Sequence, residues 1–143
     1  MKSLPLILVL ILSGCGADSD SESDVALKDI QGTWYESYDD DGINVEEYTV
    51  IRDSGDLMEY DYRASENCYN TYTNIVSKLE DQGNGNFIKS DYEEGEYTYQ
   101  TIAISLSGDE IIFKGTENDG AGYEERLTKS DFPESYFTDL LCD

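Results

Sequence analysis

The sequence contains no histidine and few basic residues. Its 143 residues include 32 acidic and 9 basic side chains, a formal net charge of −23 at pH 7. Without histidine, haem ligation by imidazole, histidine-based zinc sites and catalytic Ser-His or Cys-His pairs are excluded. The shortage of Lys and Arg argues against nucleic acid, whose phosphates these residues neutralise, and against direct binding to an anionic membrane surface.

No residue pattern in the sequence is typical of a particular class of enzyme. A glycine-rich phosphate loop is missing, and carboxylates are so frequent that no pair stands out as general acid and base. We therefore predict no enzymatic activity, no cofactor and no metal site. The acidic turn Asp39-Asp40-Asp41-Gly42 suits calcium chemically, but an EF-hand alignment on Gly42 would need ligands at Ser37 and Tyr48, and both fail. A weak, irregular calcium site is the alternative to a solvated turn.

The first 14 residues have the pattern of an export signal. Lys2 supplies a positive charge, and residues 4–12 form a mostly apolar run. This run is far shorter than the roughly 20 residues that a membrane-spanning helix needs, so it predicts a cleavable signal peptide. All the acidic residues lie after this segment, and Lys2 is the one basic residue within it. The mature chain is therefore strongly acidic, which favours solubility, and attraction of cations or of a basic partner is the alternative.

The segment Leu12-Ser13-Gly14-Cys15 resembles the lipobox of bacterial lipoproteins. The resemblance implies cleavage between Gly14 and Cys15 and attachment of acyl chains, such as palmitate, to Cys15. Because Gly16 rather than aspartate follows, the family rule would send the protein to the outer membrane in a Gram-negative cell. We thus expect a lipid-anchored protein of the cell envelope, with the lipid bilayer as a partner. An ordinary secretory signal with a chance cysteine is the alternative.

The other two cysteines are Cys68 and Cys142. An exported protein enters an oxidising compartment, where such a pair usually forms a disulfide. We predict a Cys68–Cys142 disulfide, which would tie the end of the chain to its middle. A redox-active pair and a free Cys142 are the alternatives.

The composition divides the chain into three parts. Residues 1–14 are the signal peptide, and residues 15–27 are a small, polar and acidic tether whose like charges repel one another. Residues 28–143 then form one domain. Within residues 25–30 we expect one short helical turn that leads into this domain.

The domain shows strand after strand with short turns between them. The expected strands are Thr33–Tyr38, Ile43–Ile51, Leu57–Arg63, Cys68–Leu79, Phe87–Tyr92, Tyr97–Leu106, Glu110–Thr116 and Tyr123–Lys129, followed by a helix over Pro133–Leu141. Short turns allow only antiparallel pairing. The pattern predicts an all-β fold, an eight-stranded antiparallel up-and-down barrel with a short C-terminal helix. A β-sandwich is the alternative.

At Gly32-Thr33-Trp34 the sequence resembles the lipocalin-like superfamily, in which a G-x-W motif opens the first barrel strand. The resemblance implies that Trp34 closes the base of the barrel and packs under an arginine of the last strand. Arg126 is the candidate for that arginine. A guanidinium over an indole contributes about 0.5–2 kcal/mol.

The sequence has twelve tyrosines, and such residues suit a pocket mouth or an interface because they join an apolar body to a polar tip. Tyr60 and Tyr62 share one strand face. Together with Trp34 and Tyr99, they are the predicted ligand-binding residues. The lipocalin resemblance implies a barrel that binds a small apolar or amphipathic ligand without a cofactor. The alternative is a structural or interaction lipoprotein of the envelope, with a filled barrel, no ligand and a protein partner.

Overall fold

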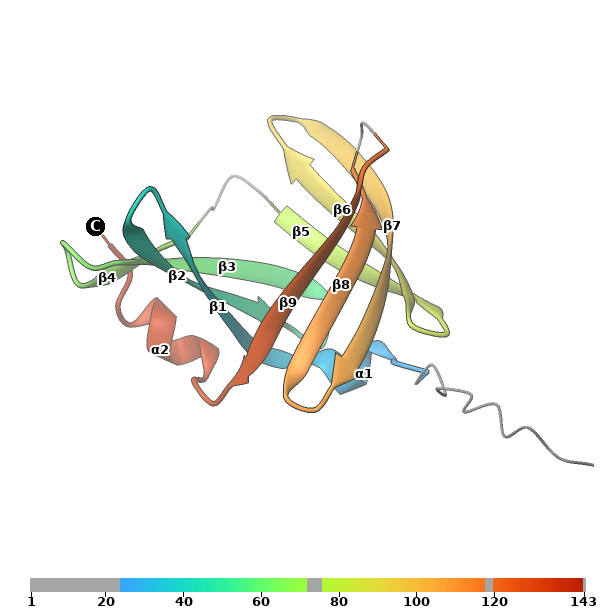
Figure 1. Cartoon of the computed structure of the whole chain (residues 1–143), viewed down its shortest axis with the longest axis horizontal. Coiled ribbons are helices and arrows are strands. Elements are labelled where there is room, and N and C mark those ends of the chain that lie inside the picture. Colours follow the sequence, from blue (N-terminus) through green and yellow to red (C-terminus); the bar gives the residue numbers. More distant parts are fainter. Residues whose placement is uncertain (1–23, 72–75, 118–119, 143) are drawn as a thin grey trace, which may run out of the picture.

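The computed structural model describes residues 24–71, 76–117 and 120–142 (Figure 1). The expected signal segment, Cys15 and most of the acidic tether lie outside these residues. The described chain forms two short helices and nine strands. In chain order they are α1 (Leu27–Ile30), β1 (Gly32–Asp40), β2 (Ile43–Ile51), β3 (Asp56–Arg63), β4 (Cys68–Thr71), β5 (Val76–Gly83), β6 (Asn86–Glu93), β7 (Glu96–Ser107), β8 (Glu110–Thr116), β9 (Gly122–Ser130) and α2 (Glu134–Thr138).

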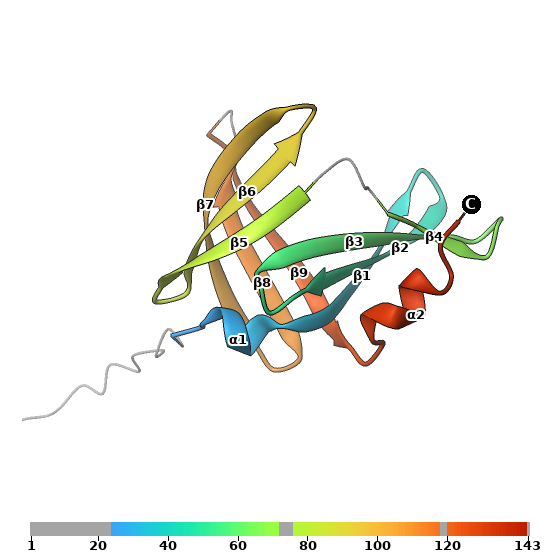
Figure 2. The same ribbon diagram turned by 180° about the vertical axis from the view of Figure 1, so that it is seen from behind.

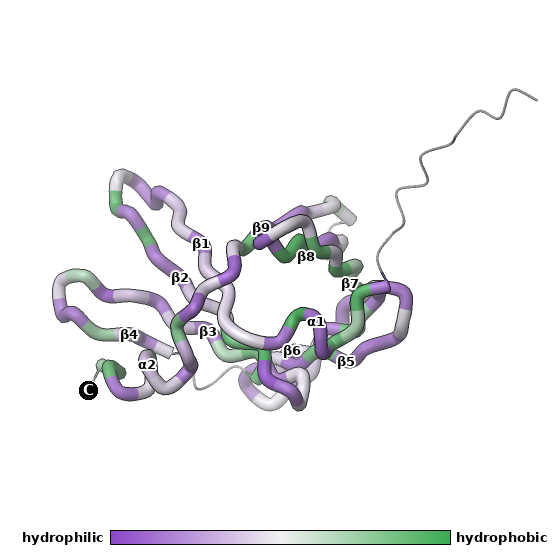
Figure 3. Tube along the Cα trace, turned by 90° about the horizontal axis from the view of Figure 1, so that it is seen from below, coloured by the Kyte–Doolittle hydropathy of each residue, from purple (hydrophilic) through white to green (hydrophobic). Residues whose placement is uncertain are grey.

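Eight of these strands close into one antiparallel barrel, which confirms the predicted fold class. The ring runs β1-β2-β3-β5-β6-β7-β8-β9, and β9 pairs with β1 to complete it. Figures 1 and 2 show the barrel from opposite sides, and Figure 3 shows its strands around one axis. Short hairpin connections allow each strand to pair with the next, so the chain needs no crossover.

The expected strand Cys68–Leu79 is divided in two. Tyr60 of β3 lies opposite Thr71 of β4, whereas Leu57 of β3 lies opposite Ser77 of β5. On β3 only two residues lie between Leu57 and Tyr60, whereas five residues lie between their partners Ser77 and Thr71. One continuous strand therefore cannot satisfy both pairings. As a result β4 stands outside the ring, paired with the far end of β3, and only β5 contributes to the barrel.

The barrel interior is apolar at the end where α1 lies, the lower end in Figure 1. The helical turn expected within residues 25–30 is α1, and it brings Ile30, which has no exposed surface, against this core. The backbone N–H of Leu27 donates to Asp81 at 2.9 Å, which ties α1 to β5. The core consists of Val25, Ile30, Trp34, Ile51, Leu57, Leu79, Phe87, Ile102, Ile104, Ile111, Phe113 and Leu127.

A second apolar cluster lies on the outer face of β2, β3 and β4, under α2. Phe137 of α2 is fully buried, and its ring centroid lies 4.9 Å from those of Tyr48 and Tyr60 and 5.0 Å from that of Tyr69. Glu134, at the start of α2, pairs with Arg52 and accepts a hydrogen bond from the Tyr60 hydroxyl at 3.1 Å. The helix is shorter than the expected Pro133–Leu141 segment, but it covers one sheet face.

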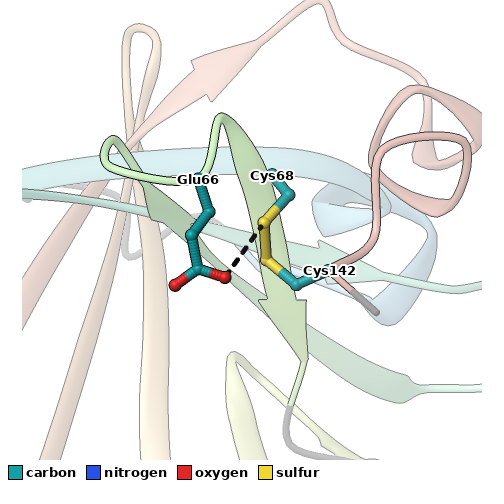
Figure 4. Close-up of side chains that lie close together, drawn as sticks. All are labelled: Glu66, Cys68 and Cys142. Carbon is teal, nitrogen blue, oxygen red and sulfur yellow. Dashed lines mark hydrogen bonds between the residues drawn. A yellow bond between two sulfur atoms is a disulfide. The ribbon is translucent and has the colours of Figure 1, made fainter.

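Cys68 and Cys142 lie at disulfide distance, as predicted, with Cα atoms 5.1 Å apart (Figure 4). Beside them, the Cys142 N–H donates to the Tyr69 carbonyl at 2.9 Å, so the C-terminal segment runs along β4. The Glu66 carboxylate approaches the Cys68 sulfur at 4.0 Å. Because oxidised sulfur offers neither a proton nor a thiolate, this group is a covalent clamp on the C-terminal segment rather than a metal site.

Candidate functional site

The barrel interior changes from apolar to charged along its axis. Strand register places Glu36 opposite Glu47, Glu47 opposite Asp61 and Thr49 opposite Glu59. These residues share a face with the core residues Trp34, Ile51 and Leu57, because inward positions recur at every second residue. On β9 the same alternation puts Glu125 on the face of the buried Leu127. Acidic side chains from β1, β2, β3 and β9 therefore converge above the apolar core; we call Glu36, Glu47, Glu59, Asp61 and Glu125 the acidic layer.

Trp34 closes the lower end of the barrel. Its side chain is 3% exposed, and its indole N–H donates to the Ile30 carbonyl at 2.7 Å. The Lys129 ammonium lies 4.3 Å from the indole centroid and donates to the Gln31 carbonyl at 2.7 Å. Gly32 has φ +115°, and a Cβ there would lie 2.7 Å from the Lys129 nitrogen, so the first position of the G-x-W motif leaves room for this cation.

The expected contact between Arg126 and Trp34 is wrong, because Lys129 takes that place. Arg126 follows Glu125 and precedes the buried Leu127, so it projects to the outer face of β9. There its guanidinium pairs with Glu124 and Glu110 at 2.6 and 3.3 Å. The signal was present in the sequence: Lys129 lies two residues from Leu127 and shares its face, whereas Arg126 does not.

The acidic layer has unusual protonation properties. Burial, and then the charges of Glu59, Asp61, Glu36 and Glu125, raise the pKa of Glu47 to about 7. Desolvation inside the barrel likewise raises the pKa values of Glu36, Glu59 and Glu125, and for Glu59 and Glu125 the charge of Lys89 opposes this rise. The layer therefore holds more negative charge than the nearby Lys89 balances, and an added cation would relieve the repulsion.

Polar residues of β5, β6, β7 and β9 complete the upper interior. Ser77 donates a short hydrogen bond to Asp91, and the Lys89 ammonium lies 3.6 Å from the same carboxylate. The Tyr123 hydroxyl donates to the Gln100 carbonyl oxygen at 3.2 Å. Each of these groups therefore has a partner within the barrel wall.

Two spaces meet at this wall. A small cavity of about 50 Å³ lies between the apolar core and the acidic layer, which is room for one or two water molecules. An open cleft of about 690 Å³ lies above it at the upper end of the barrel, and this volume is within the range of small-molecule sites. Lys89, Tyr123 and Glu125 border both spaces. The cleft is open, whereas the apolar part below it is nearly filled.

The four predicted ligand-binding residues are not brought together. Trp34 lies in the floor of the barrel, and Tyr99 lies at the rim of the cleft with 70% of its surface exposed. Tyr60 and Tyr62 face outward toward the α2 cluster. The reason is that Leu57 and Glu59 occupy the inward positions of β3, so the aromatic face of that strand packs under the helix instead of lining the interior.

The acidic layer was not predicted from the sequence. Its residues belong to strands whose other face is apolar, so the charged face appears solvent-exposed in a sequence pattern. In this barrel polar residues line the upper half of the interior, so the charged face of these strands points inward instead. The signal that could have identified it is the alternation itself, since Glu47 and Thr49 fall in step with Ile51, and Glu125 falls in step with Leu127.

Glu47 provides a pH-dependent prediction. Its pKa is about 7 in the folded chain against an ordinary value of 4.5, so its contribution to stability is complete below pH 4.5 and is lost as the pH rises through 7. Glu47→Gln should therefore raise the free energy of unfolding at pH 8 by about 1–2 kcal/mol after allowance for solvent screening, and leave it unchanged at pH 4. Urea unfolding at both pH values measures this. Glu46→Gln, on the outer face of the same strand, is the control, and an equal gain at both pH values would contradict the assignment.

Comparison of the chain with protein-family models, with curated proteins and with solved structures finds no match. Among the described residues, neither helix is long and apolar enough to cross a membrane.

Proposed function

We propose that this protein is a lipid-anchored binding module of the bacterial cell envelope that holds a small amphipathic, positively charged ligand in the upper half of its barrel. The observation that carries the proposal is the cleft of about 690 Å³, which shares Lys89, Tyr123 and Glu125 with the apolar-floored cavity below it. An apolar end of the ligand would face the floor, and its polar end would lie among the carboxylates.

The sign of the ligand's charge follows from the acidic layer. Partly desolvated carboxylates that repel one another gain most from a nearby cation, because the interaction is stronger away from bulk water. A wholly apolar ligand would leave those carboxylates unpaired, and an anion would add to the repulsion. Of the two ligand types expected from the sequence, the geometry therefore supports the amphipathic one.

Binding is best tested with two probes that share a phenylethyl body and carry headgroups of opposite charge, phenylethylamine and phenylpropionate, added to the full-length chain in a neutral detergent. Calorimetry should detect the amine and not the acid, and Glu59→Gln/Glu125→Gln should weaken amine binding about tenfold. The amine should also bind more tightly at pH 8 than at pH 6, because Glu47 loses its proton across this range. Glu46→Gln/Glu80→Gln, which removes equal charge from the outer face, is the control. Equal binding of both probes, or of neither, would contradict the proposal.

The anchoring part of the proposal depends on the lipobox at Leu12-Ser13-Gly14-Cys15. Cys15→Ser should move the protein from the membrane fraction to the soluble fraction of cells, since the acyl chains supply the membrane affinity. Immunoblotting of the two fractions measures the shift. Retention of the variant in the membrane would exclude a lipid anchor at this cysteine.

A second candidate function is that of an interaction lipoprotein whose barrel serves as a rigid support. The filled lower half of the barrel favours it, because the cavity above the core is only about 50 Å³. Native mass spectrometry of the lipoprotein distinguishes the two, since a binding module should carry a co-purifying small molecule and a rigid support should not.

A further inference from the structure

The upper half of β7 has one edge without a neighbouring strand. β7 pairs with β6 as far as its first residue, Glu96. Its pairing with β8 ends lower, at Ala103, which lies opposite Lys114. Above this point, no strand in the part of the chain that the structure describes pairs with the β8-facing edge of β7. Figures 1 and 2 show the upper part of β7 diverging from the β8–β9 hairpin. We call residues 97–101 of β7 the open edge.

Strand register directs backbone groups of the open edge away from β6. The β6–β7 turn has two residues, both with positive φ, so the flanking Glu93 and Glu96 exchange hydrogen bonds. In an antiparallel pair this exchange recurs at every second position. Tyr97, Tyr99 and Thr101 lie between the bonded positions, so their N–H and C=O groups point to the open edge. These groups offer donors and acceptors to an incoming strand.

A side chain replaces the backbone ladder at the lower end of the open edge. The Gln100 amide nitrogen donates to the Thr116 carbonyl of β8 at 2.7 Å, and the Gln100 side-chain oxygen accepts from the Tyr123 hydroxyl at 3.2 Å. The cleft of about 690 Å³ lies in this gap, because its lining includes Thr98 and Tyr99 of β7 on one side and Thr116 on the other. The open edge therefore borders the cleft directly.

The inner side of the open edge carries negative charge. On this side Thr98 lies opposite Asp91, and Glu96 lies opposite Glu93. The lining of a hollow of about 400 Å³ at the β6–β7 turn includes these four residues, and the hollow shares Asp91 and Thr98 with the cleft. Lys89 is the cation of the cleft lining, and its ammonium lies 3.6 Å from Asp91. Carboxylates therefore outnumber the ammonium group on the inner side.

We propose that an extended basic segment of a partner polypeptide adds to the open edge as an antiparallel strand. Backbone hydrogen bonds to the edge would supply affinity, as in other complexes formed by strand addition. Because Tyr97 and Tyr99 project outward, the residues opposite them would lie on the outer side, where aromatic and β-branched side chains pair well. The intervening residues would project inward, where lysine or arginine would meet the carboxylates. The segment thus alternates basic and apolar residues.

Charge argues against two other occupants of the open edge. A second copy of this chain would bring its own net charge of −23. The acidic tether of the chain itself carries charge of the same sign. In Figure 1 the described chain also begins beside α1, at the end of the barrel away from the β6–β7 turn. A basic partner, in contrast, would be attracted to this protein before contact.

The assignment of a basic partner rests on the proposed function in one respect, the sign of the charge that the upper barrel accepts. An inward lysine of the added strand would reach the cleft and would compete there with the small amine probe. The backbone pairing is separate, because a phenylethylamine molecule cannot form a strand. Binding of the amine and binding of a peptide are therefore distinguishable results.

The test uses a fluorescent peptide of sequence Lys-Tyr-Lys-Val-Lys-Tyr-Lys and two N-methylated forms of it, each titrated into the full-length chain in neutral detergent. In the antiparallel arrangement the Tyr and Val N–H groups face β7, and those of the lysines face away. N-methylation of Tyr and Val should weaken binding about tenfold, whereas N-methylation of the inner lysines should leave it within about twofold. Equal binding of the two methylated forms would show electrostatic attraction alone and overturn the proposal.

Substitutions in the protein locate the binding edge. Tyr97→Pro removes an N–H of the open edge and should weaken binding of the unmodified peptide about tenfold, whereas Tyr97→Val keeps that N–H and should retain binding. Glu93→Gln/Glu96→Gln should also weaken peptide binding about tenfold. Glu46→Gln/Glu80→Gln removes equal charge from the outer face, and an equal loss there would overturn the proposal. Circular dichroism of each variant verifies that the barrel is folded.

Three outcomes separate strand addition from the small-ligand function and from self-association. Binding of phenylethylamine without binding of the peptide would overturn strand addition and leave the proposed function intact. Peptide binding with the expected N-methylation pattern, without binding of the amine, would support strand addition and contradict the small-ligand function. Self-association of the chain that Tyr97→Pro abolishes, measured by light scattering, would assign the open edge to a second copy and overturn the proposal.

Discussion

Gly55→Ala is expected to lower the free energy of unfolding by about 2–5 kcal/mol, because two penalties add at this position. Gly55 has φ +86°, where a Cβ costs about 1–2 kcal/mol. A Cβ would also lie 2.3 Å from the Leu79 carbonyl oxygen, a backbone atom that cannot rotate away. Forcing the chains apart adds a further cost of about 1–3 kcal/mol.

The position matters because Gly55 lies beside the shortest strand pairing of the barrel, that between β3 and β5. β3 and β5 share only the pairs Asp56–Lys78 and Leu57–Ser77, and the Leu79 N–H donates to the Gly55 carbonyl at 2.8 Å beside them. Pushing Gly55 away from Leu79 would loosen this closure. We expect the Leu79 amide to exchange with solvent faster in the variant, in addition to the loss of stability.

Gly108→Ala is the matched control for Gly55. Gly108 also has a positive φ, +61°, but no heavy atom lies within 4 Å of a Cβ built there. Its substitution should cost only the backbone strain, about 1 kcal/mol. Urea unfolding and hydrogen exchange of both variants measure the difference. Equal losses in the two variants would mean that the close contact with the Leu79 carbonyl contributes nothing and that the β3–β5 pairing is not a weak point.

Phe137→Ala should lower the free energy of unfolding by about 3–5 kcal/mol, the usual cost of removing a buried phenylalanine side chain. Phe137 has no exposed surface, and the rings of Tyr48, Tyr60 and Tyr69 surround it at about 5 Å. Without it α2 retains few apolar contacts with the sheet. The helix should then separate from the barrel first, although the contacts of Glu134 with Arg52 and Tyr60 and the disulfide still connect it to the sheet.

Phe132→Ala is the control for Phe137. Phe132 stacks on Tyr136 at 4.5 Å but is 43% exposed, so its removal should cost about 1 kcal/mol. Thermal unfolding of each variant, monitored by tyrosine fluorescence and by far-ultraviolet circular dichroism, measures both effects. A loss for Phe137→Ala no larger than that for Phe132→Ala would show that the second cluster does not anchor the helix.

The fold was largely predictable from the sequence, and the candidate site was not. The strands of the prediction correspond to those of the structure because each ends at a turn marked by Gly, Asp or Asn, and such local signals act within a few residues. The prediction of one long strand over Cys68–Leu79 was wrong, because its division depends on two pairings with β3 between residues distant in sequence.

The same distinction explains the misplaced site residues. Tyr60 and Tyr62 share one face of β3 and Glu59 lies on the other, as the alternation requires, but the alternation does not say which face is inside. Because α2 packs on the outer face, the aromatic side of β3 becomes part of the second apolar cluster. That leaves Glu59 to face the barrel interior, where the carboxylates of neighbouring strands join it.

Strand period, turn residues and cysteine count were enough to predict the antiparallel barrel, the short C-terminal helix and the Cys68–Cys142 pairing, because these are local or compositional properties. Three features emerged only in the folded chain: Lys129 rather than Arg126 covers Trp34, α2 buries the tyrosine face of β3, and acidic side chains line the upper interior. Those outcomes depend on which side of the sheet turns inward when the ring closes, and that choice is made by the sum of contacts over the whole barrel.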